Sequence, residues 1–264
     1  MTSYENYSAI EILGPDEQGI LTIQLVGPGL HAIGNDAHRE LVDIWVDIAR
    51  DDRVRAVIVR GEGEKAFSAG GSFDTVTEIS HDWHARQRLM REARELVRNL
   101  IECPVPVIAA VNGPAAGAGL VIVAFADITV VGRNAKIVDG HVRLGVAAGD
   151  HAALAWPMLM SMAKAKYFLL TNEPLRGEEA ERIGMVSMCV DDDQVQTTAR
   201  EIAGRISAGS KPALGATKHT LNNWYRQNFA IFDASLAYEF TGFSGPDVIE
   251  GVASHREKRA PEFL

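Results

Sequence analysis

Small residues fill two loops of this chain, Lys65-Ala66-Phe67-Ser68-Ala69-Gly70-Gly71 and Val111-Asn112-Gly113-Pro114-Ala115-Ala116-Gly117-Ala118-Gly119. Each loop follows an apolar, β-rich run, 54–59 for the first and 105–111 for the second. Because such residues have little or no side chain, a ligand can approach the loop backbone closely. Two loops of this kind could aim two backbone N–H groups at one carbonyl oxygen and so hold a developing enolate or oxyanion. A single loop would equally suit an ordinary strand-to-helix turn, but the pair favours a site.

The composition is typical of a soluble globular protein. The chain has 264 residues, of which 47% are hydrophobic and 23% charged, and its formal net charge is −9. The acidic balance argues against a nucleic-acid partner, which needs a basic face. No apolar run is long enough to span a bilayer, and the N-terminus resembles no signal peptide. We therefore expect a cytoplasmic protein without membrane or nucleic-acid partners.

The two cysteines, Cys103 and Cys189, lie in apolar runs. We expect them to be small core residues, not a disulfide. Because the Cys and His spacings match no metal-site pattern, we expect no metal site.

Strand and helix patterns alternate along the first part of the chain. Predicted strands are 10–13, 20–25, 54–60, 107–111, 128–131 and 135–138, and predicted helices are 35–50, 82–101 and 117–126. This alternation implies an α/β fold with parallel strands and right-handed crossovers. Beyond about residue 150 the pattern is mostly helical, at 150–160, 164–170, 176–183, 195–207, 211–222, 228–240 and 246–258, with one short strand at 188–190. We predict a core over 1–190 and a C-terminal helical region over 191–264, in one continuous fold.

Four stretches, 65–71, 106–113, 126–128 and 257–263, resemble the crotonase superfamily in the right order. The resemblance implies a spiral of ββα turns with a C-terminal helical trimerisation region, giving homotrimers or hexamers that are dimers of trimers. It implies that the backbone N–H groups of Gly71 and Ala118 form an oxyanion hole. It also implies that a coenzyme A tail would lie near Lys65, Ala69 and Lys258.

Two positions depart from the pattern of the enoyl-CoA hydratases in this superfamily, which carry two glutamates that handle the water. By the same resemblance, Val121 stands at the first glutamate position and His141 at the second. A valine moves no proton, so addition of water by two carboxylates is not expected. One fold carries many chemistries, and the reaction must be argued from the site.

His141 lies nine positions before Asp150 in the glycine-containing segment 139–151, which we expect to be a loop. The imidazole pKa suits proton transfer from water at neutral pH. If the loop folds back, the Asp150 carboxylate would bind the other ring nitrogen and fix the tautomer. The structural alternatives are that Asp150 caps the helix that begins there and that His141 is a core or interface histidine.

The same segment resembles the 6-oxocamphor hydrolase branch of the superfamily, which cleaves a C–C bond of a cyclic β-diketone. That branch has a His and an Asp at this separation, followed by a Trp-Pro that Trp156-Pro157 matches. The stretch 37–41 is also similar and nominates His38, and Glu239 falls near a carboxylate of that site. Unlike that branch, this chain keeps the second small-residue loop of the relatives that use coenzyme A.

This resemblance implies a retro-Claisen cleavage in which His141, oriented by Asp150, activates water. The hydroxide attacks one carbonyl, and the C–C bond breaks to leave an enolate. His38 or the two loop N–H groups would steady the oxygen charge, and Glu239 would position water or product. The reaction requires no metal or redox cofactor, although a coenzyme A thioester could be part of the substrate.

Three functions stay open at this point. The first is hydrolysis of a C–C bond in a β-diketone or related β-dicarbonyl compound. The second is a CoA-dependent hydratase, isomerase or thioesterase in which His141 replaces the glutamate. The third is a non-catalytic binding or scaffold subunit, which the valine at 121 favours and the His141/Asp150 pair opposes.

Other polar residues are expected to be structural. His151 is predicted to be a helix-face residue, and His255 to lie on the surface. Asp74 suits a helix cap as well as a site acid. A site role for His31 stays open.

Overall fold

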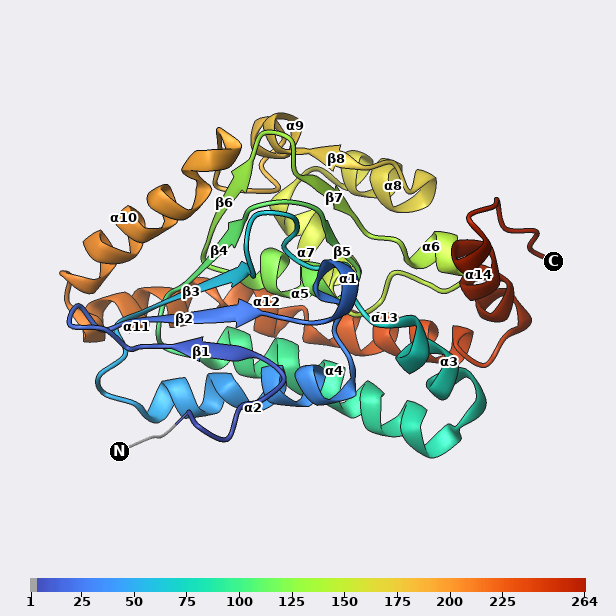
Figure 1. The fold of residues 1–264 in the computed structure, drawn as a ribbon, viewed down its shortest axis with the longest axis horizontal. Coiled ribbons are helices and arrows are strands. Elements are labelled where there is room, and N and C mark those ends of the chain that lie inside the picture. The colour runs from blue at the N-terminus through green and yellow to red at the C-terminus, as the bar shows by residue number, and fades with distance from the viewer. Residues whose placement is uncertain (1–3) are drawn as a thin grey trace.

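The computed structural model describes residues 4–264, and its central element is a six-stranded sheet (Figure 1). The strand order is β1-β2-β3-β4-β6-β9. Only β1 and β2 pair antiparallel, while all other neighbours in this sheet pair parallel. Its strands are β1 (Glu11–Leu13), β2 (Ile20–Leu25), β3 (Ala56–Gly61), β4 (Val107–Val111), β6 (Ile128–Gly132) and β9 (Met188–Val190). The six strands predicted at these places are confirmed, with ends that shift by up to two residues.

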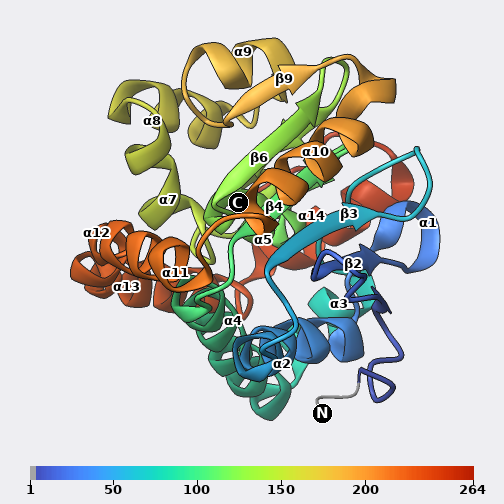
Figure 2. The same cartoon turned by 90° about the vertical axis from the view of Figure 1, so that its left-hand side faces the viewer.

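The central strands are apolar on both faces because helices cover both sides of the sheet. On one face, Ile58 and Ile108 pack against α10 (Val195–Ser207), which runs across the sheet in Figure 2. On the other face, Val57, Val59 and Ala109 join the larger core.

That larger core contains α2 (Asn35–Arg50) and α4 (Trp83–Glu102), both close to their predicted ranges. Between them lies α3 (Phe73–His81), which was not predicted. The Ser72 hydroxyl accepts a hydrogen bond from the Thr75 backbone N–H at 3.1 Å, so Ser72 caps α3. Asp74, for which a helix cap and a site acid were both open, is therefore not the cap of α3.

A second sheet carries the small-residue loop after β4. It consists of β5 (Ala115–Ala116), β7 (Lys136–Val138) and β8 (Leu175–Arg176), in the order β5-β7-β8. β5 pairs parallel with β7 and leads directly into α5 (Ala118–Phe125). The segment 139–151, expected to be a loop, contains a short helix, α6 (His141–Leu144). Because β7 is the neighbour of β5, the residues before α6 lie beside the loop that begins α5.

The last two helices, α13 (Phe229–Gly242) and α14 (Pro246–Glu257), lead to the end of the sheet where these loops lie (Figure 1). α13 packs against α4 and α7, and α14 packs against α3 and α6. The helices outside those already given are α1 (Pro28–His31), α7 (Ala152–Leu159), α8 (Met162–Thr171), α9 (Gly177–Arg182), α11 (Lys211–Leu221) and α12 (Asn223–Gln227), with a 3₁₀ turn at Asp192–Gln194. Among residues 4–264, no helix is long and apolar enough to cross a membrane. The boundary at residue 190 and the trimeric or hexameric assembly stay predictions.

Candidate active site

A cavity of about 390 Å³ lies between the two small-residue loops and the helices α3, α6, α13 and α14. Much of its wall is apolar, including Ile33, Val76, Leu89 and Phe240. The same wall contains a group of buried histidines and carboxylates, described below. An apolar cavity with a few convergent polar groups is the usual form of a small-molecule site.

The two loops touch each other at the cavity. Gly70 has φ +85°, and a Cβ atom on it would lie 2.6 Å from the carbonyl oxygen of Ala116. Only glycine allows this approach. The next residue of the second loop, Gly117, donates its N–H to the Asp139 carbonyl oxygen at 3.2 Å. The close contact therefore fixes the first loop, the second loop and the segment before α6 relative to one another.

Gly71 and Ala118 both line the cavity, as the oxyanion-hole prediction requires. Ile33 donates its N–H to the Gly70 carbonyl and accepts one from the Ser72 N–H, at 2.8 and 3.0 Å. This bridge leaves the intervening N–H of Gly71 directed away from Ile33. Ala118 is the first residue of α5, where a backbone N–H has no acceptor within the helix. Neither N–H has a backbone acceptor within residues 4–264, as the predicted oxyanion hole requires.

Asp139 holds His141 through a local turn. Its Oδ2 accepts the backbone N–H of His141 at 3.2 Å, with Gly140 between them at φ +86°. This is an Asx-type turn, in which an aspartate binds the backbone two residues on. Both carboxylate oxygens also lie 3.1 Å from His141 Nδ1. The Nδ1–H therefore donates to Asp139, and Nε2 is the nitrogen left for chemistry. The prediction that Asp150 fixes the tautomer is wrong, because Asp139 does so.

Nε2 of His141 faces two other carboxylates. It lies 3.6 Å from Asp150 Oδ1 and 3.5 Å from Glu239 Oε1, and all three side chains are buried. One ligand atom of each lies within 4.8 Å of the others, which leaves a position where a water molecule or a divalent cation could contact all three. Imidazole nitrogen and carboxylate oxygen are common zinc ligands. The absence of a resident metal stays a prediction.

Asp150 does not cap a helix. α7 begins two residues later, its cap position is His151, and no side chain caps it. Instead, Asp150 Oδ1 accepts the Nδ1–H of His151, whose Nε2 lies 3.4 Å from Asp139 Oδ1. His151, predicted to lie on a helix face, is fully buried at the N-cap position of α7. It links the two aspartates that flank His141.

The charges of this group shift the pKa values of its members. Burial would raise the pKa of Asp139 and of Asp150, but the neighbouring imidazoles His141 and His151 lower both, that of Asp150 to about 2. Burial would lower the pKa of His141, but the charges of Asp139, Asp150 and Glu239 raise it well above its usual range. At neutral pH both aspartates are therefore ionised, and His141 is an imidazolium with a proton on each ring nitrogen.

Glu239 is a buried carboxyl whose pKa is shifted towards neutral pH. Burial, together with the charge of Asp150, raises its pKa to about 7. Its Oε2 has no hydrogen-bond partner among residues 4–264. It lies on the inward face of α13 with the apolar residues Phe232, Leu236 and Phe240. A carboxylate at a position where the helical pattern predicts an apolar residue is the signal that could have identified Glu239 from the sequence.

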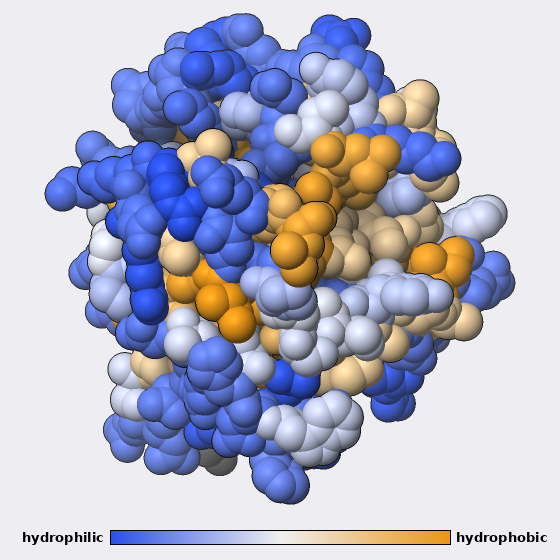
Figure 3. All heavy atoms as spheres, turned by 90° about the vertical axis from the view of Figure 1, so that its right-hand side faces the viewer, coloured by the Kyte–Doolittle hydropathy of each residue, from blue (hydrophilic) through white to orange (hydrophobic). Residues whose placement is uncertain are grey.

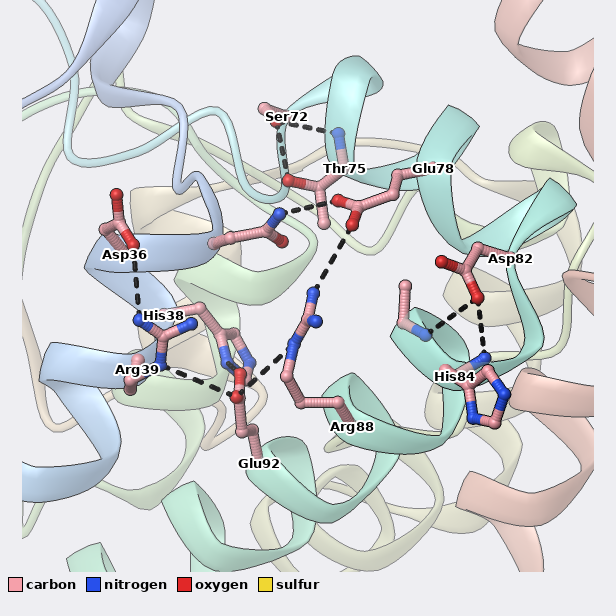
Figure 4. Close-up of polar contacts among 12 residues, drawn as sticks. Asp36, His38, Arg39, Ser72, Thr75, Glu78, Asp82, His84, Arg88 and Glu92 are labelled. Atoms are coloured by element: carbon pink, nitrogen blue, oxygen red, sulfur yellow. Dashed lines mark hydrogen bonds and ion pairs between the residues drawn. The ribbon is translucent and has the colours of Figure 1, made fainter.

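His38, on α2, is buried and lines the cavity. Its Nδ1–H donates to Glu92 Oε2 at 3.3 Å, as Figure 4 shows. Arg39 and Arg88 lie 3.9 and 3.8 Å from the other oxygen of Glu92. Burial would raise the pKa of Glu92, but the bond to His38 and the two guanidinium groups lower it. Glu92 is therefore ionised and orients the His38 ring.

The residues expected near coenzyme A lie apart from this cluster. Ala69 lines the cavity, but Lys65 and Lys258 are exposed and outside its wall. Val121 is buried and lies outside the wall, so this position gives the cavity no carboxylate.

Two further histidines are placed by the structure. His255 lines the cavity beside Phe73, with 5.4 Å between ring centroids, so placing it simply on the surface is wrong. His31 is buried, lies outside the cavity wall and contacts the Glu62 carbonyl.

Comparison with known proteins finds relatives along nearly the whole chain. A family model described as enoyl-CoA hydratase/isomerase matches residues 15–264. The 1,2-epoxyphenylacetyl-CoA isomerase of Escherichia coli (strain K12) is 29% identical over 96% of this chain and 97% of its own length. A crystal structure of an enoyl-CoA hydratase/isomerase from Mycobacterium paratuberculosis superposes with a TM-score of 0.89 at 32% identity, covering 95% of this chain and 100% of that one. A β-diketone hydrolase from the cyanobacterium Anabaena sp. PCC 7120, bound to (S)-3-oxocyclohexyl acetic acid, superposes with a TM-score of 0.82 at 26% identity, covering 90% and 95%.

Proposed function

Because the chain belongs to the enoyl-CoA hydratase/isomerase family of the crotonase superfamily, we propose a specific reaction for its site. We propose that water activated at His141 cleaves a C–C bond of a β-diketone or a related β-dicarbonyl compound. The observation that carries this proposal is the position of His141 Nε2. It faces Asp150 and Glu239 inside an apolar cavity that the N–H-bearing residues Gly71 and Ala118 also line.

The proton on the resting imidazole has an acceptor at hand. Glu239 Oε1 lies 3.5 Å from Nε2, and the pKa of this carboxyl is raised towards that of an imidazole. Transfer of one proton from His141 to Glu239 leaves the net charge of the cluster unchanged. It produces a neutral imidazole whose Nδ1–H is held by Asp139, which is the form that acts as a general base.

A water between Nε2 and the two carboxylates gives a proton to Nε2, and its oxygen bonds to one carbonyl carbon of the substrate. Gly71 N–H, Ala118 N–H or His38 stabilises the oxyanion that forms. The C–C bond breaks, and its electron pair becomes the enolate of the second carbonyl. Nε2–H returns its proton to the enolate carbon, which leaves a carboxylic acid and a ketone.

A CoA-dependent reaction is the second candidate. The chemistry it needs is an enolate held by two N–H groups, and the same two loop residues serve it. The Escherichia coli relative named as a CoA isomerase supports this candidate. Isomerisation needs one base that moves a proton between carbons, and His141 suits that role. Hydration by a pair of glutamates is disfavoured, because Val121 is apolar and lies outside the cavity wall. A scaffold role leaves the buried carboxylates without a purpose, since burying charge is costly.

Two assays on the same protein separate these candidates. Ring opening of 2,2-dimethylcyclohexane-1,3-dione, which has no proton between its carbonyls and stays neutral, to 6-methyl-5-oxoheptanoate is followed by NMR, and hydration of crotonyl-CoA by loss of conjugated absorbance. We expect ring opening of the dione or of a substituted cyclic 1,3-dione, and no hydration of the thioester. Hydration without turnover of any cyclic dione would refute the proposal in favour of the hydratase. Binding of coenzyme A without turnover of either class would favour the scaffold.

A further inference from the structure

The cavity has an acidic interior and a cationic rim. His141 and Arg143 are two residues apart on α6, and residues at this spacing point to different sides of a helix. His141 is buried, whereas Arg143 is exposed, yet both line the cavity. Phe73 and His255 form an adjoining part of the wall, on α3 and α14. Figure 3 looks onto this end of the molecule and shows apolar surface gathered between hydrophilic side chains.

Arg143 is an unpaired cation. Within residues 4–264 it has no ion pair and no side-chain hydrogen bond, and it is the one arginine or lysine in the cavity wall. Its charge also acts on His255 in the neighbouring wall. Burial lowers the pKa of His255, and the charge of Arg143 lowers it further. A guanidinium group offers a planar set of donors that suits carboxylate and phosphate groups.

The inner wall excludes an anion. Asp139, Asp150 and Glu239 meet there, and like charges in a low-dielectric site repel. An anionic group on a ligand is therefore stable only at the rim, while the apolar walls between hold a neutral, compact part. The charge distribution thus gives a bound molecule one orientation.

We propose that Arg143 binds an oxyanion of the substrate, so that the substrate combines an apolar dicarbonyl portion with an anionic group at the cavity mouth. This inference rests on the proposed function for the dicarbonyl portion only. The oxyanion has two sources with the same chemistry, a carboxylate of the substrate or a phosphate of a coenzyme A carrier. Arg143 is accordingly a determinant of substrate specificity.

Binding of unreactive probes tests this without any turnover. Cyclohexylacetate, cyclohexylacetamide and coenzyme A are titrated against wild type, Arg143→Met and Arg143→Lys by ligand-observed NMR, which measures weak affinities. We expect wild type to bind cyclohexylacetate about tenfold more tightly than the amide, the size of one charge-assisted bond at a partly exposed site. Arg143→Met abolishes this preference, and Arg143→Lys keeps part of it. Arg205→Met is the control, because Arg205 is an exposed arginine on α10 outside the cavity.

The arms of the experiment identify the source of the anion. A loss confined to cyclohexylacetate in Arg143→Met assigns the position to a substrate carboxylate. A loss confined to coenzyme A assigns it to a carrier phosphate. The proposal is overturned if wild type binds cyclohexylacetate and cyclohexylacetamide equally and if Arg143→Met leaves the affinity for coenzyme A unchanged. Because no probe reacts, this outcome is independent of whether any β-dicarbonyl compound is cleaved.

Discussion

Nδ1 of His141 lies 3.1 Å from each carboxylate oxygen of Asp139, and both side chains are buried. The same aspartate accepts the backbone N–H of His141, so a single side chain fixes the backbone and the ring of the residue two positions on. This geometry presents Nε2 to the cavity and leaves the imidazole one orientation. Positioning of this kind is what a general base needs.

The first prediction concerns Asp139→Asn. The amide can donate to Nδ1 and so favours the tautomer with the proton on Nε2, which is no base. We expect kcat for β-dicarbonyl cleavage to fall about 10²- to 10⁴-fold with little change in KM. The matched control is Asp36→Asn, an exposed aspartate paired with Arg39 on the surface of α2. A kcat within twofold of wild type in Asp139→Asn would show that the tautomer is set elsewhere.

The second prediction is a pH profile. Glu239 must be ionised to take the resting proton of His141, and its pKa is raised to about 7. Activity is therefore absent at low pH, where Glu239 is protonated, and kcat/KM rises as the pH passes through about 7. In Glu239→Gln no carboxylate can take the proton, so the rise near pH 7 disappears and activity appears only at higher pH, where His141 loses its proton. An unchanged midpoint in Glu239→Gln would assign the titration to another group.

The third prediction uses Gly149, which lies against α13. A Cβ atom there would lie 2.3 Å from the Ser235 carbonyl oxygen and 2.7 Å from Glu239 Cβ. Gly149→Ala must displace α13 and with it Glu239. We expect a loss of about 1–3 kcal/mol in unfolding free energy, the usual cost of overpacking, together with reduced turnover. Gly204→Ala in α10 has open space and serves as the control, with equal or higher stability.

The fourth prediction concerns metals. The proposed chemistry uses the imidazole and carboxylates alone, so dialysis against a chelator leaves kcat unchanged. Added Zn²⁺ inhibits, because it can bind His141 Nε2, Asp150 and Glu239 at the position the water needs. Zn²⁺ and protons compete for these three side chains, so the inhibition weakens as the pH falls. It is also weaker in Glu239→Gln than in wild type. Activity that disappears on chelation and returns with Zn²⁺ would instead make this cluster a catalytic metal site.

Periodicity in the sequence predicted most of the fold because long apolar patterns decide helix and strand. The inward stripe Leu41, Ile44, Trp45 and Ile48 defines α2 without any knowledge of its neighbours. The short helices α3 and α6 were missed because each begins at a turn and not in a long apolar stripe. Their positions depend on turn chemistry at Ser72 and Gly140.

The candidate site was predicted only in part, because its hydrogen bonds join residues from several elements. His141, Asp150, His38 and Glu239 all line one cavity, as nominated. The partner of each histidine was not predicted. Asp139 is two residues from His141, and an Asp-Gly-His turn could have identified it. Glu92 lies on α4 and reaches His38 across a helix pair, a contact that no local pattern reveals.

The most direct test of the account is the rate of β-dicarbonyl cleavage by His141→Ala, with and without added imidazole. We expect the rate constant at saturating substrate to fall by about 10²- to 10⁴-fold, the usual contribution of a general base. Free imidazole should restore part of it, because it can occupy the space beside Asp139. A wild-type rate in His141→Ala, on a substrate that the wild type cleaves, would contradict the claim that this imidazole activates the water.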